Sequence, residues 1–133
     1  MAKPMYVRFE VPKEMIERTY QVVETARDTG KVRKGTNEVT KLIEKKMAKL
    51  VVMAEDVQPE EILAHIPLLC EEKGVPFTYV PSKQELGVAS GLKKATASAA
   101  VIDPGKGADA MKALIADITK LTKGEKKGEN SVG

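Results

Sequence analysis

The residues best equipped to bind a ligand lie in one segment, 32–42, where a short basic run meets the start of a predicted helix. Asn37 and Lys41 are four residues apart, so they share one face of that helix, and Glu38 lies beside them. The cluster combines a carboxamide, an ammonium group and a carboxylate with the positive end of a helix dipole. Phosphate would suit Lys34, Lys41 and the free backbone N–H groups, but Glu38 would repel it.

The edge of a guanine base suits all three side chains. Guanine O6 and N7 accept hydrogen bonds and can face Lys41 or the Asn37 amide, whereas N1–H and N2–H₂ donate and can face Glu38. A sheared G·A pair leaves O6, N7 and N1–H free, so the cluster fits non-canonical guanines in folded RNA. Each residue alone also has a structural explanation: Gly35 as a helix N-cap, Glu38 as a complement to the dipole, Lys41 as a solvated lysine. Only their combination favours binding.

A second candidate segment covers residues 82–91, which we expect to be a very short helix followed by a loop. Leu86, Val88 and Ala89 are apolar residues beside two glycines, and exposed apolar residues in a loop call for a partner surface. An RNA base extruded from its stack is one such partner, and Lys83 could neutralise a nearby phosphate. The alternative is that Leu86 and Val88 pack into the core beneath a short helix.

Catalytic and metal-binding patterns are weak. The one histidine, His65, is flanked by apolar residues and has no second His or Cys at metal-ligand spacing. Glu55 and Asp56 are adjacent at a strand end and should point apart. Residues 103–107 form a Gly-rich turn that lacks the Gly-x-x-x-x-Gly-Lys-Ser/Thr phosphate-binding pattern, and Cys70 sits in an apolar stripe, as a buried inert thiol would. We therefore predict no enzymatic activity, metal or cofactor, with a small-molecule enzyme using Asp56 or the 103–107 turn as an alternative.

Composition indicates one globular domain. The chain has 133 residues, of which 42% are hydrophobic and 31% charged, enough for a real core. The net charge of +3 permits nucleic-acid binding without demanding it. Aromatic residues make up only 4%, which argues against a base-stacking platform for single strands. No apolar run is long enough to cross a bilayer, so we expect a soluble, cytoplasmic protein without membrane contact.

Apolar periodicity predicts alternating helices and strands. Residues 5–9 form a short extended arm, and the last helix ends at about Leu121, before a disordered tail over 123–133. Pro67 implies a kink or break in the third helix. The predicted helices are 12–30, 35–48, 59–74, 82–86 and 108–121, and the strands are 31–34, 50–54, 75–80 and 96–102.

Such alternation is typical of an α/β domain with helices on both faces of the sheet. The apolar run 50–54 should be a central strand covered on both faces. Right-handed crossovers should bring the carboxyl ends of parallel strands to one edge. We therefore expect the loops 55–58 and 81–91 at that edge, with the helix that starts at Gly35 beside them.

Two motifs together resemble a known family. The stretches Gly35-Thr-Asn-Glu-Val-Thr-Lys41 and Leu86-Gly-Val-Ala-Ser90 are similar to the archaeal L7Ae protein family of the large ribosomal subunit. Residues 51–56 and 76–83 agree with it, and the resemblance covers about residues 5–121. A related eukaryotic kink-turn protein of the spliceosome and box C/D particles has the same layout. The resemblance implies a three-layer α-β-α sandwich around a central mixed four-stranded sheet, and binding to kink-turns and kink-loops, which contain tandem sheared G·A pairs.

Carried over to this chain, the resemblance implies that Asn37, Glu38 and Lys41 read the guanines, while residues 34–36 approach the RNA backbone. Leu86, Val88 and Ala89 would cover the extruded nucleotide, with Lys83 on phosphate and Ile62 in support. The full set of expected RNA-binding residues is Lys34, Gly35, Thr36, Asn37, Glu38, Lys41, Ile62, Lys83, Leu86, Gly87, Val88, Ala89 and Ser90.

The eukaryotic relative carries a charged residue where this chain has Val88, which fits the broader archaeal type that accepts kink-loops as well. We expect a single RNA-binding domain over 1–122 that serves in ribosome and guide-ribonucleoprotein assembly. Its expected partners are ribosomal RNA, box C/D and H/ACA guide RNAs and, as a further candidate, RNase P RNA, together with other guide-particle proteins and the ribosomal subunit. The alternative is a ribosomal protein of the same fold bound to a single site on ribosomal RNA.

Overall fold

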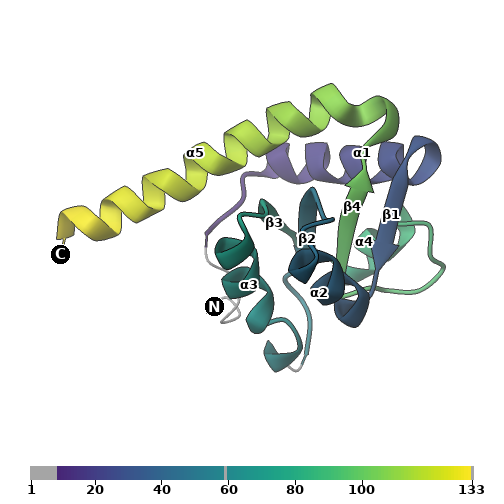
Figure 1. Cartoon of the computed structure of the whole chain (residues 1–133), viewed down its shortest axis with the longest axis horizontal. Coiled ribbons are helices and arrows are strands. Elements are labelled where there is room, and N and C mark those ends of the chain that lie inside the picture. Colours follow the sequence, from purple (N-terminus) through teal and green to yellow (C-terminus); the bar gives the residue numbers. More distant parts are fainter. Residues whose placement is uncertain (1–8, 59, 133) are drawn as a thin grey trace.

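A computed structural model describes residues 9–58 and 60–132 of the chain, and side chains as far as Leu121. The predicted arm at 5–9 falls outside these residues, apart from Phe9. In the described part, four strands form one mixed sheet in the order β1-β4-β2-β3 (Figure 1). The strands are β1 (Lys31–Lys34), β2 (Leu50–Ala54), β3 (Phe77–Val80) and β4 (Ser98–Asp103). β2 is parallel to β3, whereas β4 is antiparallel to both β1 and β2.

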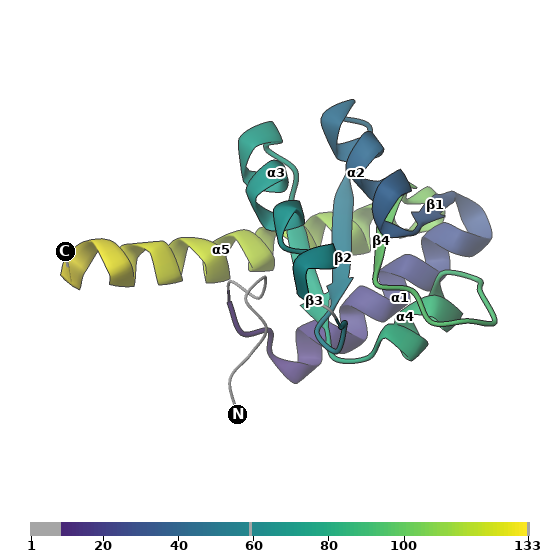
Figure 2. The same ribbon diagram turned by 90° about the horizontal axis from the view of Figure 1, so that it is seen from below.

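Helices cover both faces of the sheet, so the predicted three-layer α-β-α arrangement is confirmed. α1, α4 and α5 pack together on one face, and α2 and α3 on the other (Figures 1 and 2). All five residues of β2 are buried, as expected for a central strand between two helical layers. The helices are α1 (Lys13–Thr29), α2 (Thr36–Glu44), α3 (His65–Lys73), α4 (Lys83–Ala89) and α5 (Ala108–Val132), with single 3₁₀ turns η1 (Glu60–Ile62) and η2 (Gly105–Gly107).

α2 is shorter than its apolar pattern predicted. It ends at Glu44 rather than near Ala48, because Lys46 adopts a left-handed conformation with φ 59°. The N–H groups of Met47 and Ala48 then both turn back to the carbonyl of Leu42. The Met47 side chain is consequently exposed instead of continuing the buried stripe.

The segment from residue 60 to 74 also differs in detail. The break in it falls between η1 and α3, and Pro67 produces no kink because it is the third residue of α3. At that position its missing N–H would have no partner within the helix. Ile62 lies on η1 and is 41% exposed.

α5 continues to Val132, past the predicted end at Leu121. Its first part packs on α1, with Leu114 and Ile118 buried. The division into a domain over 1–122 and a tail over 123–133 stays a prediction. No helix in the described residues is long and apolar enough to cross a membrane.

Candidate nucleic-acid interface

The sheet brings the candidate segments to one edge. Ala54 at the end of β2 pairs with Val80 at the end of β3, and Lys34 at the end of β1 pairs with Ala99 near the start of β4. The segments that follow β1, β2 and β3, and the loop that precedes β4, therefore meet at the same edge (Figure 2). This is the edge predicted from strand order, and the start of α2 lies there too.

The first turn of α2 is anchored to β4 at this edge. Gly35 is the N-cap residue of α2, with φ 94°, and its N–H donates to the carbonyl of Ser98 at 3.1 Å. The hydroxyls of Thr36 and Ser98 lie 3.4 Å apart. The side chains of Asn37, Glu38 and Lys41 are exposed. The anchored turn thus presents an amide, a carboxylate and an ammonium group to solvent, as a base-reading cluster requires.

α3 braces the same turn from the side. The Thr40 hydroxyl donates to the carbonyl of Thr36 at 2.7 Å, and His65 Nε2 lies 2.8 Å from the same hydroxyl. Because the Thr40 proton is used in the first contact, Nε2–H of His65 donates in the second. His65 is an exposed residue with a structural partner, and it ties α3 to the helix that carries the cluster.

A pocket of about 380 Å³ opens between β1 and the first turn of α2, lined by Val32, Arg33, Lys34 and Glu38. Two cations and one carboxylate surround it, which matches an occupant with both acceptors and donors. Arg33 was not among the sequence-predicted residues. Arg33 could have been found from its place in the basic run, because alternate residues of a strand point to the same face. In β1 the alternate residues Lys31 and Arg33 are the more exposed ones.

The short helix predicted in the second segment is present but extends three residues further than expected, so residues 87–89 are helical rather than part of a loop. α4 spans Lys83–Ala89, and Ser82 caps it by accepting a hydrogen bond from the Glu85 N–H at 3.2 Å. Leu86, Ala89 and Ser90 occur at three- and four-residue spacing, so they share the inner face of α4 and are buried.

This burial corrects the expectation that Leu86 and Ala89 present apolar side chains to a partner. Leu86 belongs to the core, as the structural alternative held, whereas Val88 on the outer face is 57% exposed. Lys83 is also exposed. Of the apolar residues predicted here, Val88 is the one whose side chain reaches solvent.

Gly87 lets a neighbouring loop pack directly on α4. A Cβ at this position would lie 1.9 Å from the carbonyl oxygen of Lys94. The N–H of Thr96 donates to the carbonyl of Lys83 at 3.0 Å, so the loop runs alongside the whole helix. Lys93 and Lys94 are exposed on that loop and join the basic edge. Sequence reasoning missed both because their local pattern is that of an ordinary charged loop.

Asp56 has a structural partner at this edge. Its Oδ1 accepts from the backbone N–H of Lys83 at 2.8 Å and so fixes the start of α4. The Asp56 carboxylate, which the alternative of a small-molecule enzyme would use, thus already holds a backbone N–H group. Among the described residues, no three His, Cys, Asp or Glu side chains are grouped to hold a metal ion.

Comparison with known proteins shows similarity to a protein family and to solved structures. The Ribosomal protein L7Ae/L30e/S12e/Gadd45 family matches residues 17–111 of this chain, a range that contains β1, α2, α4 and β4. Among solved structures, the Giardia lamblia 15.5kD RNA binding protein superposes with a TM-score of 0.83 at 28% sequence identity. That match covers 90% of this chain and 99% of the other.

Proposed function

Because the chain belongs to the Ribosomal protein L7Ae/L30e/S12e/Gadd45 family, we propose that it is a non-enzymatic RNA-binding protein that recognises kink-turns and kink-loops. The observation that carries the proposal is the exposed trio Asn37, Glu38 and Lys41, held on an anchored helix start beside the pocket of Arg33 and Lys34. A site for phosphate alone would not have a carboxylate at its centre, because the two groups repel each other. A guanine edge fits such a site, because its N1–H donates to the carboxylate while O6 and N7 accept from the amide and ammonium groups.

The basic residues along the edge supply contacts of a second kind. Lys34, Lys83, Lys93 and Lys94 bring positive charge to the two flanks of the base-reading trio. Such side chains neutralise RNA phosphates and position the RNA without reading its sequence. A sharply bent RNA, which brings two backbones close to one protein edge, suits this arrangement of charges better than a straight helix.

The proposed targets are kink-turns in large-subunit ribosomal RNA and in box C/D and H/ACA guide RNAs, with RNase P RNA as a further candidate. The protein would help to assemble these particles in the cytoplasm, next to their other proteins. The similarity of the Giardia lamblia RNA binding protein supports RNA as the ligand. We propose that the chain belongs to the archaeal branch of the family, because the exposed residue in the last turn of α4 is the apolar Val88.

A gel-shift titration tests the proposal. The probe is a short kink-turn RNA, and its control is the same RNA with both sheared G·A pairs changed to G·C. Tight binding to the first RNA alone is expected. Equal binding to both would contradict kink-turn recognition. A box C/D guide RNA serves as a third probe, and failure to bind it would leave only a single site on ribosomal RNA.

A further inference from the structure

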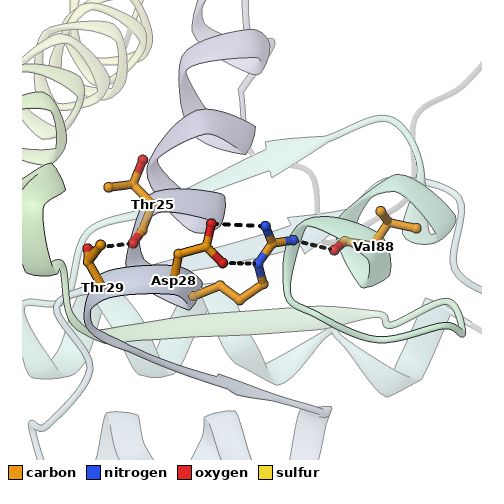
Figure 3. A network of polar contacts seen from close by, with 5 residues as sticks. Thr25, Asp28, Thr29 and Val88 are labelled. Atoms are coloured by element: carbon orange, nitrogen blue, oxygen red, sulfur yellow. Dashed lines mark hydrogen bonds and ion pairs between the residues drawn. The ribbon is translucent and has the colours of Figure 1, made fainter.

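The backbone that carries the exposed Val88 side chain is held by a contact from a different helix. Val88 lies in the last turn of α4, which has only seven residues. Its carbonyl oxygen accepts two hydrogen bonds, from the Gly91 N–H at 3.0 Å and from Arg27 Nη1 at 3.1 Å. Arg27 is on α1, so this contact joins two elements that are 61 residues apart in the chain (Figure 3).

The Arg27 guanidinium is itself oriented by its neighbour Asp28. Nε donates to Oδ1 at 2.8 Å and Nη2 donates to Oδ2 at 3.2 Å, a forked pairing that sets the plane of the guanidinium (Figure 3). This hydrogen bonding holds the pKa of the Asp28 carboxyl below its usual value. The remaining nitrogen, Nη1, then points at the Val88 carbonyl.

The end of α1, which carries Arg27 and Asp28, is held in place as well. The Thr29 hydroxyl donates to the Thr25 carbonyl at 2.7 Å (Figure 3). It also accepts from the Lys106 N–H at 2.9 Å, so the end of α1 is tied to η2. On the other side, Gly91 has φ 92°, and a Cβ there would lie 3.0 Å from Arg27 Cδ. The aliphatic stem of Arg27 therefore lies against the turn that follows α4.

We infer that Arg27 is a positioning residue for RNA recognition, which holds Val88 in the geometry that meets the RNA. This inference rests on the proposed function. Arg27 belongs to neither of the two motifs that resemble the family. It acts through the Val88 backbone, and Asp28 keeps it in the orientation needed for that contact.

The test is a double-mutant cycle with the kink-turn RNA and the full chain. Arg27→Gln removes the guanidinium and is expected to weaken binding about tenfold, the scale of one hydrogen bond to a charged group. Val88→Ala removes the positioned side chain. If Arg27 acts through Val88, the double variant Arg27→Gln/Val88→Ala binds no more weakly than Val88→Ala alone.

Arg18→Gln is the matched control. Arg18 is also on α1, and its Nη1 pairs with Asp117 of α5 at 2.6 Å. The side chains of Arg18 and Arg27 are 30% and 32% exposed, so the two substitutions remove the same charge from similar surroundings. Arg18→Gln is expected to leave RNA affinity unchanged. Asp28→Asn, which loosens Arg27 without removing it, is expected to weaken binding in the same direction by a smaller factor.

Three outcomes would overturn the inference. Arg27→Gln could lower RNA affinity by the same factor in the unchanged protein and in Val88→Ala, which would show that Arg27 touches the RNA directly. The slope of log affinity against log salt would then fall by about one unit. Unchanged affinity for Arg27→Gln would remove the positioning role. A matching loss for Arg18→Gln would point to a general effect of charge. The proposed function itself fails in a different way, when the unchanged protein does not distinguish the G·A from the G·C probe.

Discussion

In the proposed interface, Glu38 is the residue whose chemistry favours base reading over simple phosphate binding. It is exposed on the first turn of α2 and lines the pocket that Arg33 and Lys34 also border. A carboxylate among cations weakens phosphate binding but accepts hydrogen bonds from guanine N1–H and N2–H₂. The two kinds of contact, with base edges and with phosphates, therefore predict different behaviour for different single substitutions.

Glu38→Gln keeps the shape of the side chain but replaces one acceptor oxygen with a donor. We expect it to cost about 1–3 kcal/mol in binding the kink-turn RNA, the scale of one good base-edge contact. The loss should be smaller on the RNA with G·C pairs, so discrimination narrows. Glu44→Gln, at the far end of the same helix, is the control. Unchanged discrimination in Glu38→Gln would show that this carboxylate reads no base.

Lys83→Gln should behave differently, because an exposed lysine near phosphate contributes without reading bases. Affinity is expected to fall by a similar factor for every RNA, and the slope of log affinity against log salt should decrease by about one unit. Titrations at several salt concentrations with both probes measure this. A loss confined to the kink-turn probe would instead place Lys83 on a base.

Cys70 illustrates what burial does to a titratable group. The thiol is fully buried on α3, and burial raises its pKa to about 12, against about 8.5 for an exposed cysteine. The folded state therefore favours the protonated thiol. Its contribution to stability is complete below the unfolded pKa and is lost as the pH rises towards the folded value.

Thiol labelling tests this expectation. At pH 8.5 an alkylating reagent should modify Cys70 slowly in the folded protein and rapidly in denaturant, since only the unfolded chain offers a thiolate at that pH. Rapid labelling of the folded protein at this pH, without loss of structure by circular dichroism, would contradict the buried placement.

Among the elements, α4 shows how a short helix is held in a defined position at the proposed binding edge. Seven residues are too few for a helix that is stable alone. Hydrogen bonds to Asp56 and Ser82 fix its start, and the hydrogen bond from Arg27 fixes its end. The buried side chains of Leu86 and Ala89 fix its rotation about its own axis. The outward position of Val88 follows from these contacts rather than from helix propensity.

Gly87→Ala should destabilise the protein although alanine is the better helix former. In an ordinary helix this change stabilises by about 1 kcal/mol. Here the new Cβ would meet the Lys94 carbonyl oxygen at 1.9 Å, so the loop with Lys93 and Lys94 must move. We expect a loss of about 1–3 kcal/mol, typical of overpacking.

Chemical denaturation of Gly87→Ala measures this loss, and Gln84→Ala on the exposed side of α4 is the control. RNA affinity should also fall, because the displaced loop carries two of the edge's lysines. An increase in stability for Gly87→Ala would show that the loop does not pack on α4 as described.

In the molecule as a whole, the sheet brings the proposed RNA-binding residues to one edge, and α5 lies apart from them. The edge is assembled from the ends of β1, β2 and β3 and the start of β4. α5 packs on α1 through its first part and extends away from the sheet (Figure 1). Binding should therefore depend little on the last residues of the chain.

Truncation after Thr122 tests this expectation together with the proposed domain over 1–122. Leu114 and Ile118, which are buried against the core, remain in the shortened chain. We expect its melting temperature and its affinity for the kink-turn RNA to match those of the full chain. A clear fall in affinity with unchanged melting would assign an RNA contact to residues 123–133.

Much of the fold was predictable because the signals for it are local. The apolar run of β2, the helical spacing of α1 and α3 and the alternation of elements each depend on residues close together in the chain. The trio Asn37, Glu38 and Lys41 was recognisable for the same reason, since three- and four-residue spacing in one helix already places side chains on a common face.

Other features depend on contacts between distant segments, and no local pattern reveals them. Which face of α4 turns inward is decided by the layer it packs on, so Leu86 is buried and Val88 is exposed. The reach of Arg27 to Val88 requires α1 and α4 to lie side by side. Residue types and their spacing therefore indicate which elements form and which side chains carry the hydrogen-bonding groups of the proposed base contacts. Packing of those elements against one another determines which of these side chains face solvent, because burial is a property of the assembled layers.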